Sequence, residues 1–207
     1  MHIAIYSDVI CPWCFVGKRR LERALDEAGS SADAAIEWLP FELNPYMPAD
    51  GMERSAYRAR KFGAERAAEL DEQMRATGEA EGIRFAFDRM ARTPNTRKAH
   101  MLIAHASRQG RGPAAVEALF TAYFERGQDI GDEAVLVAVA AEIGLDAAAA
   151  KAALGDDGLR DAVLQAESHA GELGISGVPF FIVDRKWAVS GAQPAQAWAD
   201  ALQQMAA

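Results

Sequence analysis

The two cysteines of this 207-residue chain, Cys11 and Cys14, lie three positions apart in the motif Cys-Pro-Trp-Cys. Two thiols at this spacing can exchange electrons as a dithiol and a disulfide, or they can supply half of a metal site. A third interpretation is that both are core residues that lie close together by accident. A proline inside the motif, at a predicted junction between strand and helix, favours the redox pair.

The position of the motif gives the two thiols different expected roles. Residues 2–10 are typical of a short buried strand, and residues 14–29 have the apolar spacing of a helix. Cys11 is expected at the helix N-cap, where free N–H groups and the helix dipole favour a thiolate, and Pro12 suits the first helical position. We therefore predict that Cys11 is the nucleophile and that Cys14, one turn inside the helix, is the resolving thiol.

The histidines argue against a metal site. Tetrahedral zinc needs three or four ligands, which usually come from closely spaced Cys or His pairs. The four histidines are His2, His100, His105 and His169. Only the loosely spaced His100 and His105 share a predicted helix, so we predict no metal and no cofactor besides the redox-active disulfide.

A second segment supports the redox interpretation. In ISGVPFFIVD, Val178 and Pro179 come directly before a predicted strand. A cis bond at Pro179 would leave a strand edge open beside Cys11, where an extended thiol substrate could form backbone hydrogen bonds to Val178. The alternative is a trans proline that only begins an edge strand.

The order of elements predicts an α/β protein. The strand of residues 2–10, the following helix and a second strand at 36–43 form a parallel βαβ unit, and Pro40 indicates an edge or a bulge in the second strand. After residue 174 two strands return, joined by a tight turn at Asp184–Arg185 and followed by a last helix.

The middle of the chain changes character. Residues 51–173 are rich in Ala, Glu and Arg, with punctuation that indicates five or six helices. We therefore predict a domain made of residues 1–50 and 174–207, with residues 51–173 as a helical insertion. The mixed-charge run at 55–75 is expected to be a solvated helix face.

Composition limits the partners. The chain has 22 basic and 30 acidic residues and a formal net charge of −8, so it has no general attraction for nucleic acid or anionic lipid. No segment approaches the roughly 20 apolar residues of a membrane span, and the N-terminal sequence lacks the pattern of a secretory signal. We predict a cytoplasmic protein with neither a nucleic acid nor a membrane as partner.

Four segments resemble the DsbA-like thioredoxin superfamily. They are YSDVICPWCFVGKRRLE, LPFELNPYMPADG, TPNTRKAHMLIAHA and GVPFFIVDRKWAVSGAQPAQAW. They follow the family's order, and they are most similar to the FrnE-like subfamily. The resemblance implies a thioredoxin fold (βαβ and ββα) interrupted by a large helical insertion, an active site at Cys11 to Cys14, and a cis-proline at Pro179.

The resemblance leaves several activities open. Relatives include 2-hydroxychromene-2-carboxylate isomerases and kappa-class glutathione transferases, which typically carry Ser where this chain has Cys11. The presence of both cysteines favours thiol–disulfide exchange on a protein or small-molecule substrate. The alternatives are a glutathione-dependent isomerase or transferase, with glutathione as co-substrate, and a non-catalytic thiol-binding module. A monomer and a homodimer both fit.

The resemblance also implies substrate-binding residues. Asn95, Thr96 and His100 match the family's NT…AH segment and are predicted to contact substrate or glutathione; alternatively they cap and hold their helix. Pro12 and Trp13 are expected beside the substrate, although Trp13 could instead shield the resolving thiol. Val178 and Pro179 complete the predicted site.

Overall fold

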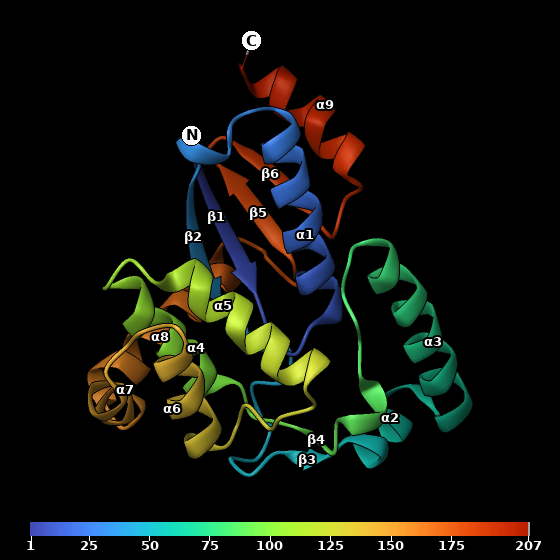
Figure 1. Ribbon diagram of the computed structural model, residues 1–207, viewed down its shortest axis with the longest axis vertical. Coiled ribbons are helices and arrows are strands. Elements are labelled where there is room, and N and C mark those ends of the chain that lie inside the picture. Colours follow the sequence, from blue (N-terminus) through green and yellow to red (C-terminus); the bar gives the residue numbers. More distant parts are fainter. Residues whose placement is uncertain (207) are drawn as a thin grey trace.

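A four-stranded mixed sheet brings the two ends of the chain together (Figure 1). The structure, a computed structural model, describes residues 1–206. The strands lie in the order β2-β1-β5-β6, and their bounds are β1 His2–Ser7, β2 Ala35–Pro40, β5 Phe180–Val183 and β6 Trp187–Ser190. The sheet is flanked by α1 (Pro12–Glu27) and α9 (Ala195–Ala206) on one face.

The pairing register of β1 with its two neighbouring strands determines which chain segments lie side by side at the edge of the sheet. β1 is parallel to β2 and antiparallel to β5, with Tyr6 opposite Phe180. The end of β1 and the start of β5 therefore lie at the same edge of the sheet. This pairing confirms the predicted βαβ unit and the predicted antiparallel strand at Phe180. It places the cysteine motif, which follows β1, next to Val178–Pro179, which precede β5.

Local sequence signals account for the ends of several strands. β2 is an edge strand and ends at Pro40, three residues earlier than expected, because its partner β1 ends at Ser7, directly opposite Pro40. Asp184 and Arg185 have φ angles of 48° and 58°, as a tight hairpin turn requires. The turn between β5 and β6 is therefore confirmed.

The two faces of the sheet are buried by different helices. Ile3 and Ile5 of β1 pack with Phe181 and with Trp198 of α9 in one apolar cluster. On the opposite face Tyr6 packs with residues at and beyond the end of α8 (Asp157–Glu172). Successive side chains of a strand point to opposite faces, so β1 contributes to both clusters.

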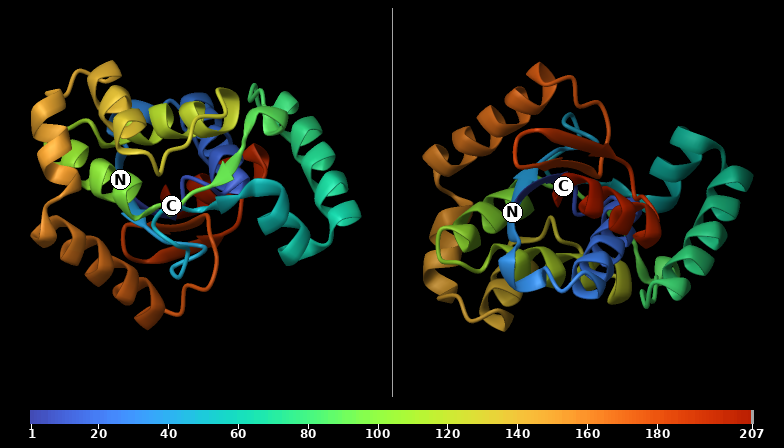
Figure 2. Two further views of the ribbon diagram at one scale, coloured as in Figure 1. Left: turned by 90° about the horizontal axis from the view of Figure 1, so that it is seen from below. Right: turned by 90° about the horizontal axis from the view of Figure 1, so that it is seen from above.

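Between β2 and β5 the described part of the chain holds seven α-helices, where five or six were expected. They are α2 (Arg54–Phe62), α3 (Ala64–Ala80), α4 (Arg97–Ser107), α5 (Gly112–Phe120), α6 (Glu133–Glu142), α7 (Ala147–Leu154) and α8. Helices α2 and α3 lie on one side of the molecule, and α6, α7 and α8 lie on the other (Figures 1 and 2). A two-stranded sheet, β3 (Met52–Glu53) with β4 (Arg92–Thr93), was not predicted. Two-residue strands are too short to show a periodic pattern.

Helix α1 approaches the start of β5 very closely at Gly17. A Cβ atom placed on Gly17 would lie 3.0 Å from Pro179 Cγ and 3.4 Å from Phe181 Cζ. Any larger residue would therefore push the helix and the strand apart. Glycine at this position lets the cysteine-bearing helix rest directly on Pro179.

We expect Gly17→Ala to lower the free energy of unfolding by about 1–2 kcal/mol, because the added methyl group overpacks this contact. The matched control is Gly171→Ala in α8, where an added Cβ meets nothing within 4 Å. That change should stabilise the protein by roughly 0.5–1 kcal/mol through helix propensity alone. Urea unfolding followed by circular dichroism measures both. Equal stabilisation by the two substitutions would show that the approach of α1 to Pro179 is not a constraint.

Candidate active site

The cysteine motif begins α1. Cys11 is the N-cap residue and Pro12 is the first residue of the helix, as the sequence predicted. The backbone N–H of Cys14 donates to the Cys11 carbonyl at 3.0 Å. Both cysteines are free thiols. The first turn of α1 contains no acidic residue, so no carboxylate competes there for the free N–H groups.

The segment before β5 contacts Cys11 directly. The Cys11 thiol donates to the carbonyl oxygen of Val178 at 3.7 Å, across 167 positions of sequence. The Val178–Pro179 peptide bond is cis. Trp13 is 45% exposed and stands beside this contact at the surface. The structure thus brings together Cys11, Val178 and Pro179, which the sequence analysis grouped in one site.

The two thiols have different surroundings. Cys14 is only 1% exposed, and this burial raises the pKa of its thiol well above the ordinary value; the neighbouring Cys11 acts in the same direction. Contacts with Ser7 and with the backbone of Asp8 oppose the rise but do not cancel it. Cys14 is therefore held as a neutral thiol at neutral pH.

A cleft of about 350 Å³ opens beside Cys11, and we call it the Cys11 cleft. Cys11, Pro12 and Trp13 form one end of it, whereas Cys14 does not line it. Its apolar wall is formed by Leu43, Phe62, Met74, Phe87, Met90 and Phe124. Phe124 belongs to a π-helical turn, Thr121–Glu125, that continues α5. The cleft gives a small molecule access to only one of the two sulfur atoms.

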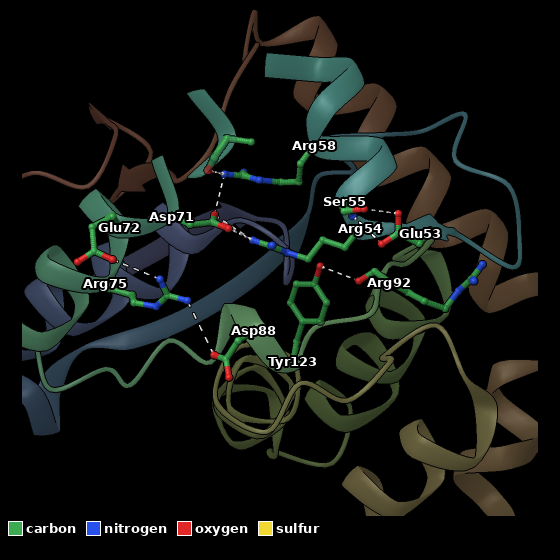
Figure 3. A network of polar contacts seen from close by, with 11 residues as sticks. Glu53, Arg54, Ser55, Arg58, Asp71, Glu72, Arg75, Asp88, Arg92 and Tyr123 are labelled. Carbon is green, nitrogen blue, oxygen red and sulfur yellow. Dashed lines mark hydrogen bonds and ion pairs between the residues drawn. The ribbon is translucent and has the colours of Figure 1, made fainter. Parts of the chain in front are cut away.

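One wall of the Cys11 cleft is charged (Figure 3). Arg54 donates to both oxygens of Asp71 at 2.9 and 2.8 Å, and Arg58 donates to the same carboxylate at 2.7 Å. The expectation that residues 55–75 form a solvated face holds for most of this run but fails at Arg58 and Asp71, whose side chains are only 18% and 16% exposed. Helices α2 and α3 meet across this charged cluster, which in sequence has the same pattern as an exposed charged surface. The aromatic residues Tyr57 and Phe62, interspersed among the charged residues, were the sequence feature that could have indicated a partly buried face.

Asn95 and Thr96 do not line the Cys11 cleft. Asn95 donates to the carbonyl of Met47 at 2.8 Å and accepts from the backbone N–H of Arg97 at 3.0 Å. Thr96 is buried as the N-cap residue of α4. These contacts match the alternative in which the two residues hold the start of their helix.

His100 is also away from the Cys11 cleft, buried against Asp8. Its Nε2 lies 3.5 Å from Asp8 Oδ1, and the two side chains are 3% and 0% exposed. Burial alone would lower the pKa of His100, but the close contact with Asp8 and the negative charges of Asp8, Glu167 and Glu42 raise the pKa overall. Asp8 also accepts from the backbone N–H of Leu43 at 2.8 Å. The pair therefore ties the segment before the cysteine motif to α4.

A second buried ion pair lies close by. Arg97 binds the carboxylate of Glu42 through two hydrogen bonds of 2.8 and 2.9 Å. Glu167 of α8 is influenced by this pair: burial, together with the charge of Glu42, raises the pKa of Glu167 to about 7. Sequence reasoning did not find Asp8, Glu42 or Glu167, because their importance depends on which helices meet around them.

Within residues 1–206, no group of three or more His, Cys, Asp or Glu side chains is placed to hold a metal ion. None of the helices in this range has the length and apolarity that crossing a membrane requires.

Comparison with known proteins identifies the family. The model of the DSBA-like thioredoxin domain matches residues 2–203, and the chain belongs to this family. The protein YwbO of Bacillus subtilis (strain 168), itself uncharacterised, is 33% identical over 184 residues, which cover 88% of this chain and 86% of YwbO.

Comparison with solved structures supports the same fold. The probable DsbA oxidoreductase SCO1869 from Streptomyces coelicolor is 34% identical, with a TM-score of 0.91, covering 99% of this chain and 89% of that chain. A 2-hydroxychromene-2-carboxylate isomerase has a TM-score of 0.76 at 15% identity, covering 100% of this chain and 96% of that chain, which shows the fold alone. The expected DsbA-like thioredoxin fold with a helical insertion is confirmed. The FrnE-like subfamily and the domain boundaries stay predictions.

The raised pKa of Glu167 predicts a pH-dependent effect. Between pH 4.5, its ordinary pKa, and about 7, the folded protein binds a proton there that the unfolded chain has lost, so the wild type loses stability as pH rises through this window. Glu167→Gln should therefore raise the free energy of unfolding at about pH 8 by about 1 kcal/mol, after allowance for solvent screening of this partly exposed group. At about pH 4 it should change little.

Urea unfolding at both pH values checks this expectation. The control is Asp161→Asn, an exposed residue of the same helix beside Arg160, which should leave the pH dependence of stability as it is in the wild type. A Glu167→Gln variant with the wild-type pH dependence would contradict the assignment.

Proposed function

We propose that this DsbA-like protein is a thiol–disulfide oxidoreductase in which Cys11 is the nucleophile and Cys14 the resolving thiol. The observation that carries the proposal is the asymmetry of the pair. Cys11, although only 5% exposed, lines the cleft at the start of α1, while Cys14 is 1% exposed, does not line the cleft and has a raised pKa. Only Cys11 can meet a substrate sulfur first.

The reaction then follows from the positions of the two sulfurs. The Cys11 thiolate attacks one sulfur of a substrate disulfide RSSR, forms a mixed disulfide and releases RS⁻, which takes up a proton. Cys14 then gives up its proton and attacks the Cys11 sulfur, and a second RS⁻ leaves and is protonated. Two electrons have moved from the protein dithiol to the substrate, and the protein holds a Cys11–Cys14 disulfide. The reverse sequence oxidises a substrate dithiol.

The surrounding residues support these steps. The positive end of the α1 dipole, together with the backbone N–H of Trp13, favours negative charge on the attacking sulfur. The Val178 carbonyl, held by the cis bond to Pro179, orients the Cys11 thiol, and Pro12 and Trp13 line the cleft beside it. We assign Asn95, Thr96 and His100 to holding the backbone around the site, on the contacts described above, in place of the substrate contact expected from the sequence.

The proposed partner is a thiol or disulfide substrate, with glutathione as a candidate co-substrate. Residence in the cytoplasm, the absence of a cofactor and the choice between monomer and homodimer stay predictions.

We expect Cys11→Ser to lower the rate of insulin reduction by at least about a hundredfold, because a serine hydroxyl does not ionise near neutral pH and cannot form a mixed disulfide. Cys14→Ser should accumulate a mixed disulfide on Cys11, because no second thiol remains to release it. Turbidity of reduced insulin and intact-protein mass spectrometry measure the two effects.

The same variants test the isomerase alternative. An isomerase of the serine type would keep or gain activity on 2-hydroxychromene-2-carboxylate when Cys11 becomes Ser, and Cys14→Ser would trap nothing. That result would overturn the exchange reaction. The double variant Cys11→Ser/Cys14→Ser is the control that must not form any mixed disulfide.

A further inference from the structure

The size and position of the Cys11 cleft restrict what can reach the nucleophile. Its volume of about 350 Å³ lies within the range of sites for small molecules. The start of α1 closes one end, the π-helical turn after α5 forms the floor, and helices α2 and α3 form the outer wall. A ligand whose sulfur reaches Cys11 lies largely inside this enclosure.

The floor of the Cys11 cleft suits a flat apolar group. The largely buried rings of Phe87 and Phe124 line it, packed edge to face with centroids 6.4 Å apart, and Phe85 stacks on Phe87 from within the core. Met74 and Met90 add two unbranched thioether side chains that adapt to the outline of a ligand. Trp13, half exposed at the mouth, offers a further ring to a bound aromatic body.

The outer wall carries an excess of positive charge. Arg54, Arg58 and Lys61 line it, and Asp71 is the one carboxylate among the described residues that line the cleft, so the net charge is three minus one, or +2. Nearby carboxylates are engaged elsewhere (Figure 3): Glu53 caps the start of α2. The chain as a whole has a net charge of −8, so this local positive charge would attract anionic ligands to the cleft in particular.

One cationic group on this wall is open to a ligand. Arg54 and Arg58 are held by Asp71, whereas the side chain of Lys61 lines the Cys11 cleft and is exposed. A carboxylate that enters the cleft can therefore pair with the Lys61 ammonium next to the Arg58 guanidinium.

We infer that the substrate of the Cys11 cleft is a small disulfide, or its thiol, with a flat apolar body and a carboxylate group that Arg58 and Lys61 bind. The inference rests on the proposed function, since the ligand's sulfur must exchange with Cys11. The electrons move as described above: the small disulfide accepts two electrons and leaves as two thiols. The apolar floor holds the body, and the charged wall sets the orientation that points the sulfur toward Cys11.

The first experiment compares two aromatic disulfides of different charge. The reduced protein reacts with 5,5′-dithiobis(2-nitrobenzoate), which carries carboxylates, or with neutral 2,2′-dithiodipyridine, and released thiol is followed by absorbance in stopped flow. In Arg58→Gln/Lys61→Gln the rate constant for the anionic probe should fall about tenfold, while the rate constant for the neutral probe changes less than twofold.

A matched control separates the site from the overall field. Arg60→Gln/Arg66→Gln removes the same amount of charge, one residue from α2 and one from α3, at exposed positions outside the cleft. It should leave both rate constants within about twofold of wild type, since exposed charges are screened by salt. Lys61→Gln alone keeps the Arg–Asp cluster intact and should show a smaller loss of the same kind. Equal losses with both probes, or in the control, would overturn the inference.

The second experiment tests binding without chemistry. Cys11→Ser/Cys14→Ser is titrated with 2-naphthoate and with neutral 2-naphthamide in a calorimeter. The carboxylate should bind at least about tenfold more tightly, and Arg58→Gln/Lys61→Gln in the same background should abolish the difference.

The exchange assays and the binding titration together show whether the proposed exchange reaction or the proposed ligand class fails. If naphthoate binds as expected but no variant forms a mixed disulfide, the proposed exchange reaction fails and the ligand class stands. If exchange with insulin proceeds while naphthoate and naphthamide bind equally weakly and both probe disulfides respond alike, the small-ligand inference is overturned and a protein substrate takes its place.

Discussion

The contact between the start of α1 and the segment before β5 is the constraint on which the rest of the site depends. Gly17 lets the helix lie against Pro179, and the Cys11 thiol meets the Val178 carbonyl. These segments come from opposite ends of the chain, so no local turn could hold them together. The antiparallel pairing of β1 and β5 does so, because its register fixes both segments at one edge of the sheet.

Helix α1 is fixed from two directions. One face packs on the sheet through Leu21 and Leu25. The other face carries Phe15, whose ring stacks on Phe120 at 4.9 Å between centroids in the largest apolar cluster. The helices between β2 and β5 therefore share a core with the redox helix, and they hold it as firmly as the sheet does.

Features encoded by local patterns could be predicted from the sequence. Cys11 as N-cap, Pro12 at the first helical position and the turn at Asp184–Arg185 each depend on the conformational preferences of neighbouring residues. The charged wall and the Asp8–His100 pair could not be predicted in this way. A helix in sequence shows which face is polar, but whether that polar face meets solvent, a cleft or another ion depends on how the helices pack. His100 stood out in the sequence, yet the side on which α4 buries it became evident only in the fold.

The charges around Cys11 and Cys14 are distributed unevenly, and the excess of positive charge lies along the cleft. Asp8 with His100, and Glu42 with Arg97, are buried as pairs of opposite charge. Such pairs add little net field, since the two charges largely cancel at a distance. The uncompensated charge near Cys11 is therefore the positive wall of the cleft. In the proposed reduction of a small disulfide, each exchange step would release a thiolate into this cleft, where the positive wall stabilises the leaving anion. Under the proposed mechanism, this arrangement would favour cleavage of the mixed disulfide toward a departing small thiol, with the buried Cys14 as the attacking group.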